Sequence, residues 1–326
     1  MIKDFLGKVP AGMMVVPMLL SAIINTLFPD LFKIGGFTQA VFTTAGTAGI
    51  IGAQLVCMGA QLRFKELFAV VRRGGTLLVS KFLIGAVIGI AIGKIFGMEG
   101  ILGLTTLAVV SAVTNSNGSL YLALMCTYGD EVDQTSMSLL SINDGPFLTL
   151  VALGASGMAN VPVIALIAVL GPILFGMLLG NLDKKMSEFL APGVTMLIPF
   201  VGICLGAGIN ISAIVSGGAS GILLGIITIF ISGPFVVFCD RLINRRPGYA
   251  GWAVTTTAGN AIAVPAMVAA VDPTWAPYVA IATTQVAAST VLTAICIPFI
   301  TAWWAKKYGC PQIPLKSDTS KPTTAN

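Results

Sequence analysis

Histidine is absent from the 326 residues, and only 10% of them are Asp, Glu, Lys or Arg. Without imidazole there is no His-ligated metal site and no Ser-His-Asp triad. The chain also lacks a GxxxxGK[ST] ATPase loop and the HExxH and GxSxG motifs of hydrolases. The six cysteines contain no CxxC pair, which disfavours a disulfide framework or a cysteine metal site. We therefore predict no enzyme chemistry, no metal and no cofactor.

The shortage of charge also decides the fold class. Soluble proteins carry about 25% charged residues, so this chain cannot cover a water-facing surface. Apolar residues make up 56% of it, in continuous runs that exclude a porin-type barrel. We predict an all-α polytopic membrane protein with ten transmembrane helices, at residues 9–28, 38–61, 74–96, 100–128, 132–157, 162–181, 192–209, 217–241, 249–271 and 277–304.

Basic residues fix the orientation of these spans. The two termini and the even-numbered junctions hold 15 of the 18 Lys and Arg residues; the other junctions hold Lys33 and Lys94, and Lys81 lies inside a span. An excess of Lys and Arg marks the cytoplasmic side, so both termini are predicted to be cytoplasmic. The pairs at 72–73 and 245–246 then mark topology and do not contact nucleic acid. Residues 309–326, rich in Pro, Ser, Thr and Lys, are predicted to be a disordered tail.

The spans repeat in order after the fifth. The stretch at 56–62 (VCMGAQL) returns at 203–209 (ICLGAGI), and Thr114 and Asn117 match Thr257 and Asn260 at an offset of 143. We therefore predict two five-helix halves, 1–158 and 159–308. An odd number of spans in each half forces the halves into opposite orientations, which is the inverted repeat of many secondary transporters.

Polar residues interrupt the fourth and ninth spans at corresponding places. The first interruption is 111–119 (SAVTNSNGS) and the second is 255–260 (TTTAGN). Such residues are poor helix formers at membrane depth, which predicts broken helices that cross at the midplane. Two half-helix N-termini facing one another favour an anion site, although simple hydrogen bonding between neighbouring helices is the alternative. The candidate substrate ligands are Thr114, Asn115, Ser116, Asn117, Ser119, Thr257, Gly259 and Asn260, with Gln285 and Gln54 as weaker candidates.

Asp144 is the one carboxylate well inside a predicted span, beside Asn143 and a Gly-Pro pair. Carboxylates inside a membrane are costly and usually functional. In a chain without histidine, Asp144 is the natural carrier of a coupling proton. A sodium site that uses Asp144 and Asn115, or a permanently paired structural carboxylate, stays open. Lys81 is the one cation inside a predicted span. Either it has a function, or it lies close enough to the end of the span for its ammonium group to reach the membrane surface.

These stretches resemble the bacterial 2-keto-3-deoxygluconate permease family, most specifically at 114–119 (TNSNGS) and 143–146 (NDGP). The resemblance implies uptake of this anionic sugar acid across the bacterial inner membrane with a cation, usually a proton. The family is distantly similar to bile-acid/sodium symporters, which implies a panel of spans 1–2 and 6–7 and a core of spans 3–5 and 8–10. Those relatives bind sodium with a glutamate in helix 9, where this chain has no carboxylate, so H⁺ is favoured over Na⁺ as the coupling ion. A sodium-coupled organic-anion symporter and a channel are the alternatives.

Overall fold

The computed structural model describes residues 3–4, 6, 12–62, 64–143, 145–161, 163–207 and 211–314. Most of these residues are helical, and no β-strand occurs among them. A chain in lipid has to pair its backbone amides and carbonyls internally, and a helix does so within one segment. The prediction of an all-helical membrane protein is confirmed.

Four described segments are long and apolar enough to cross a membrane: Val70–Phe96, Lys184–Cys204, Gly217–Ile243 and Pro273–Tyr308. A fifth candidate is a bent pair, Gly36–Phe42 with Thr44–Gly59. Shorter apolar stretches occur at Val16–Leu27, Pro146–Ala155, Leu170–Leu182 and Asn260–Val271 of the described residues. Ten spans in two inverted halves therefore stay a prediction.

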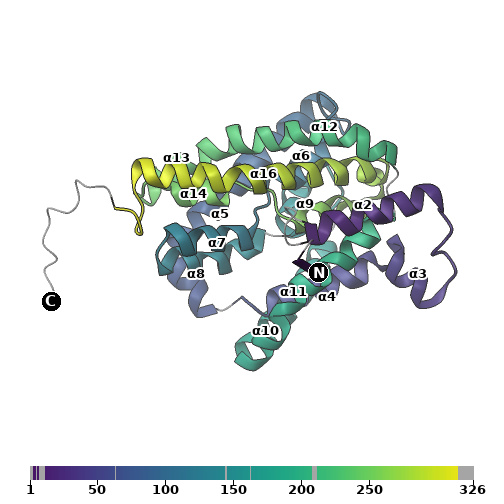
Figure 1. Ribbon diagram of the computed structural model, residues 1–326, viewed down its shortest axis with the longest axis horizontal. Coiled ribbons are helices and arrows are strands. Elements are labelled where there is room, and N and C mark those ends of the chain that lie inside the picture. Colours follow the sequence, from purple (N-terminus) through teal and green to yellow (C-terminus); the bar gives the residue numbers. More distant parts are fainter. Residues whose placement is uncertain are drawn as a thin grey trace, which may run out of the picture.

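The described helices pack in two groups (Figure 1). The panel, as we call the first group, has α2 against α11 and α4 against both α10 and α11. In the core, the second group, α5 packs on α6 and α8, and α16 packs along α12 and on α14. The panel comprises α2 (Gly12–Leu27), α3 (Gly36–Phe42), η1 (Thr44–Gly46), α4 (Thr47–Gly59), α10 (Val163–Leu182) and α11 (Lys184–Gly206). The core comprises α5 (Phe64–Phe96), α6 (Thr106–Val113), α7 (Gly118–Tyr128), α8 (Glu131–Leu140), η2 (Ser141–Asn143), α9 (Pro146–Ala155), α12 (Ile211–Ile227), the π-helical η3 (Thr228–Ser232), α13 (Gly233–Ile243), α14 (Tyr249–Val254), η4 (Asn260–Ala263), α15 (Val264–Val271), η5 (Pro273–Tyr278) and α16 (Val279–Tyr308).

The sequence predicts the second span, residues 38–61, as one continuous helix. In the structure this span is bent. It bends by 81° between α3 and η1. Thr43 causes the break, because its hydroxyl donates to the Gln39 carbonyl at 2.7 Å and accepts from the Ala45 amide at 3.3 Å. These side-chain bonds compete with the backbone bonds of a continuing helix.

The paired arginines do more than mark topology. Arg73 donates to Asp130 at 2.7 Å, and Arg246 donates to Asp133 at 2.8 Å and to Asp130 at 3.2 Å. Burial by itself would raise the pKa of Asp130, but the hydrogen bond from Arg73 and the charge of both guanidinium groups hold that pKa below its ordinary value. The cluster joins the start of α5, the α7–α8 turn and the α13–α14 turn, which are all parts of the core.

Glycines at every fourth position of α5, at 85, 89 and 93, allow it to lie close to α6. A Cβ atom on Gly85 would lie 2.6 Å from the Thr114 amide nitrogen and from the Val113 carbonyl carbon. One on Gly89 would collide with the side chain of Val110. Small residues thus let the two backbones touch where α6 ends.

We expect Gly85→Ala to destabilise the protein, because the new methyl group meets backbone atoms that cannot move aside. Overpacking of this kind typically costs about 1–3 kcal/mol. Gly218→Ala on α12 is the matched control, since a Cβ atom there meets nothing within 4 Å. Thermal unfolding of the purified protein in detergent should show a lower midpoint for Gly85→Ala alone. Equal midpoints in both variants would contradict the close approach.

Candidate functional site at two helix breaks

The first break separates α6 from α7 at the place that the sequence predicts. Helix α6 ends at Val113, and α7 starts at Gly118 with Asn117 as its N-cap. The Asn117 side-chain oxygen accepts from the Leu120 amide at 3.0 Å. Since an amide oxygen at this position satisfies one of the free N–H groups of a helix start, Asn117 fixes where α7 begins.

The second break separates α14 from η4 and α15. Helix α14 ends at Val254, and the helical conformation resumes at Asn260. Gly259 precedes this second start, and no side chain caps it. The positive end of the η4–α15 segment is therefore open to an anion in a way that the start of α7 is not.

The two breaks touch. The backbone amide of Asn117 donates to the Thr256 hydroxyl at 2.9 Å, across 139 residues of sequence. The side-chain amide of Gln54, from α4 in the panel, reaches the Asn260 side-chain oxygen at 3.4 Å and the Val194 carbonyl at 2.9 Å. The breaks therefore meet each other in the core, and the panel reaches the second one.

Several predicted ligands already have protein partners. The Thr114 hydroxyl lies 2.9 Å from that of Thr149, and the Thr257 hydroxyl lies 2.8 Å from that of Ser289. The Asn115 amide donates to the Ser111 carbonyl at 2.8 Å and its oxygen accepts from the Gly145 amide at 2.9 Å. Sequence reasoning missed Thr149 and Ser289, for which the only signal is a small hydroxyl residue in an apolar run. It placed Thr256 inside the second interruption but did not name it as a ligand. These bonds hold the breaks in shape.

Gln285 lies away from the breaks. Its oxygen accepts from the Thr105 hydroxyl at 2.8 Å, and its amide donates to the Ser220 hydroxyl at 2.9 Å. Thr105 is the N-cap of α6, at the far end of that helix from the break. The contacts of Gln285 thus tie α16 and α12 to the start of α6, and a role in binding stays a prediction.

Other predicted ligands are buried without partners. The Ser116 hydroxyl and both polar atoms of the Asn143 side chain form no hydrogen bond with any described residue. Asn143 is fully buried and Ser116 is 1% exposed. Buried polar groups are nearly always paired, so these three atoms are candidates for contact with a bound solute or ion, as is the unpaired Ser111 hydroxyl in the same interruption.

The proposed coupling residue Asp144 lies outside the described residues, and so does the side chain of Ser119. Their flanking residues are placed. Asn143 ends η2, and the Gly145 amide is held by Asn115 of the first break. The chain on both sides of position 144 therefore lies beside the first break.

Lys81 is fully buried, so a position at the membrane surface is excluded. Its ammonium nitrogen lies 3.4 Å from the hydroxyl oxygen of Ser232, at the end of the π-helical turn η3. No described carboxylate lies within 4 Å of it. A buried charge with so weak a partner is costly and points to function, as do π-turns.

A cavity of about 790 Å³ lies between panel and core. Helices α4 and α10 form one wall, and α15 and α16 form the other. Its lining is mainly apolar, with hydroxyl groups from Thr44, Thr47 and Thr283. Ile51 and Leu55 of α4 line it, and α4 also carries Gln54, which contacts Asn260 of the second break.

Sequence comparisons identify the family of this chain. The family model described as KdgT, 2-keto-3-deoxygluconate permease, matches residues 3–310. The chain belongs to this family. It is 48% identical over 306 residues to 2-keto-3-deoxygluconate permease 1 of Salmonella typhimurium, covering 94% of this chain and 96% of that one. It is 38% identical to the 2-keto-3-deoxygluconate permease of Enterobacter sp., covering 94% of each chain, and 35% identical to that of Escherichia coli O7:K1, covering 94% of this chain and 95% of that one.

Membership of the 2-keto-3-deoxygluconate permease family makes the protein a multi-pass membrane transporter and not an enzyme. In a permease, the breaks, the buried unpaired groups and the cavity are the candidates for contact with the solute. A solute that crosses the membrane has to pass polar groups that lipid cannot reach.

We expect Lys81→Met to raise the thermal midpoint of the permease and to lower its transport rate. Methionine fills a similar volume and removes the cost of burying an amino group whose partner is a single hydroxyl. Unfolding in detergent and uptake into proteoliposomes would measure the two effects. Full uptake in Lys81→Met would show that the charge has no part in transport.

Proposed function

We propose that this protein imports 2-keto-3-deoxygluconate across the bacterial inner membrane together with a proton, by alternating access. The hydrogen bond between the Asn117 amide and the Thr256 hydroxyl carries the proposal, because it joins the two breaks into one polar site. The relatives named for this permease supply the substrate class. Both termini would lie in the cytoplasm, as the positions of Lys and Arg predict.

The inverted repeat forms part of this proposal. Equivalent threonines of the two breaks make equivalent contacts: Thr114 with Thr149 in α9, and Thr257 with Ser289 in α16. Each pair joins a break to the span that follows it. Two halves, 1–158 and 159–308, would then place one substrate between matching breaks.

The substrate would bind polar groups that have no hydrogen-bond partner among the described residues. Its carboxylate would face the uncapped start of η4 at Gly259 and Asn260, and its hydroxyls would meet Ser116 and the side-chain N–H₂ of Asn117. Alternating access would come from movement of the core against the panel. Gln54 spans the two groups, and its 3.4 Å contact with Asn260 is long for a hydrogen bond and therefore easily exchanged.

Asn117→Ser and Asn260→Ala should each weaken substrate binding. Serine still caps α7 but lacks the amide donor, so the fold is retained while one substrate contact is lost. A hydrogen bond to a charged group is typically worth about 1.5–3 kcal/mol, which corresponds to roughly ten- to hundredfold in affinity. Calorimetric titration of purified protein with 2-keto-3-deoxygluconate measures the change. Wild-type affinity in both variants would refute a site shared by the breaks.

Asp144→Asn should abolish accumulation driven by a pH gradient, because an amide cannot bind and release the coupled proton. Substrate binding should persist. Asp240→Asn is the matched control, since Asp240 is a buried carboxylate in a candidate span and accepts a hydrogen bond from the Asn244 side-chain amide at 2.9 Å. Proteoliposomes with proton and sodium gradients imposed separately would measure accumulation. If the wild type requires sodium, Asp144 becomes an ion ligand and the proton proposal is wrong.

A further inference from the structure

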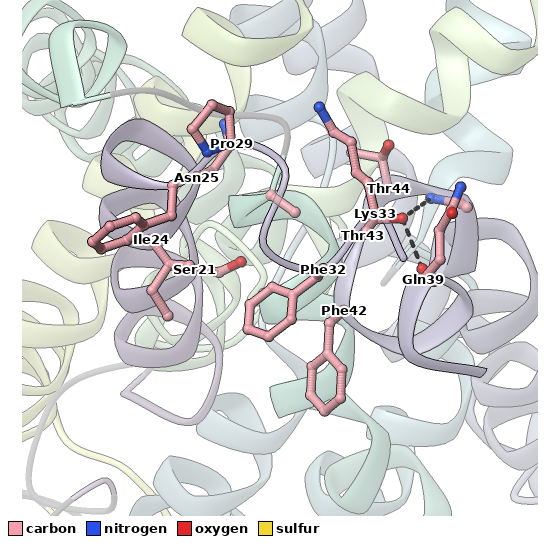
Figure 2. A pocket seen from close by; sticks show the side chains of 13 residues that line it. Ser21, Ile24, Asn25, Pro29, Phe32, Lys33, Gln39, Phe42, Thr43 and Thr44 are labelled. Carbon is pink, nitrogen blue, oxygen red and sulfur yellow. Dashed lines mark hydrogen bonds between the residues drawn. The ribbon is translucent and has the colours of Figure 1, made fainter. Parts of the chain in front are cut away.

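A second, smaller pocket lies beside the large cavity, at the bend between α3 and η1. Its volume is about 250 Å³. Figure 2 shows Ser21, Ile24 and Asn25 of α2 on one side, with Lys33, Gln39 and Thr44 on the other. The rings of Phe32 and Phe42, with centroids 5.2 Å apart, line it as well. The pocket therefore combines one cation, several uncharged polar groups and an apolar surface.

The polar groups on the Lys33 side are available to a ligand. No described residue forms a hydrogen bond with the Gln39 amide or the Thr44 hydroxyl. Among the described residues Lys33 pairs only with Asp30, at 3.2 Å, and their side chains are 54% and 85% exposed. An ion pair so exposed is weak and is easily exchanged for another anion.

The pocket adjoins the large cavity between panel and core. Thr44 and Ala45 line both the pocket and the 790 Å³ cavity. By the predicted topology, Lys33 and Lys94 are the only cations at the non-cytoplasmic junctions. Lys33 lines the pocket and Lys94, in the last turn of α5, does not.

We propose that this pocket is an outer capture site for the sugar acid: Lys33 binds the substrate carboxylate, and Gln39 and Thr44 bind its oxygens before the substrate enters the large cavity. The inference rests on the proposed function. A cation that lines a pocket raises the local concentration of an anion there. The neighbouring rings of Phe32 and Phe42 offer a surface for the carbon chain of the substrate.

Uptake into right-side-out vesicles tests the capture site by the KM for external 2-keto-3-deoxygluconate. Lys33→Gln should raise KM by about two- to fivefold at low ionic strength, with an unchanged maximal rate, and the difference should shrink in high salt. Lys94→Gln makes the same charge change outside the pocket and should leave KM unchanged. Thr44→Val replaces the hydroxyl with a methyl group of similar size. It should raise KM by an amount that does not depend on salt.

Inside-out vesicles supply the second arm. There the substrate enters from the other face, so Lys33→Gln should not alter KM. Equal effects of Lys33→Gln and Lys94→Gln, or an unchanged KM in Lys33→Gln, would overturn the proposal; a lipid phosphate held by Lys33 would give the latter result. Absence of any uptake by the wild type would instead overturn the proposed function, so the two failures are distinguishable.

Discussion

Hydrocarbon offers no hydrogen bonds, and this constraint governs the whole structure. Each helix break inside a membrane leaves backbone amides and carbonyls that only protein groups can satisfy. Here the second break satisfies a backbone amide of the first, since the Asn117 amide donates to the Thr256 hydroxyl. Thr149 and Ser289 complete the contacts from the following spans. Interrupted helices are stable in this protein because they meet.

The same constraint divides the polar residues of the site by role. Thr114, Asn115 and Thr257 use their side chains to hold the breaks. Ser116 and Asn143 are equally buried and have no partner among the described residues. A transporter needs both kinds, because polar groups that are fully satisfied within the protein have nothing to offer a substrate.

The contacts within the core differ from the contacts between the core and the panel. Within the core, glycines allow backbone contact and the Arg73, Arg246, Asp130 and Asp133 cluster ties several turns together. Between the groups lie a mainly apolar cavity and the long Gln54–Asn260 contact. This contrast is compatible with the proposed alternating access, in which the core would move against the panel as a rigid body.

Composition alone determined that this is a helical membrane protein, because 10% charge cannot cover a water-facing surface. The polar stretches also located both breaks, since Asn, Ser, Thr and Gly interrupt helices wherever they cluster. Only the tertiary structure decided which of those side chains already have hydrogen-bond partners and that Gln285 lies away from the breaks. It also showed that Lys81 is wholly buried and that the second span bends at Thr43. Partners such as Thr149 come from distant parts of the chain, and local sequence carries no record of them. The fold brings such residues together, so their roles appear only once the helices are packed.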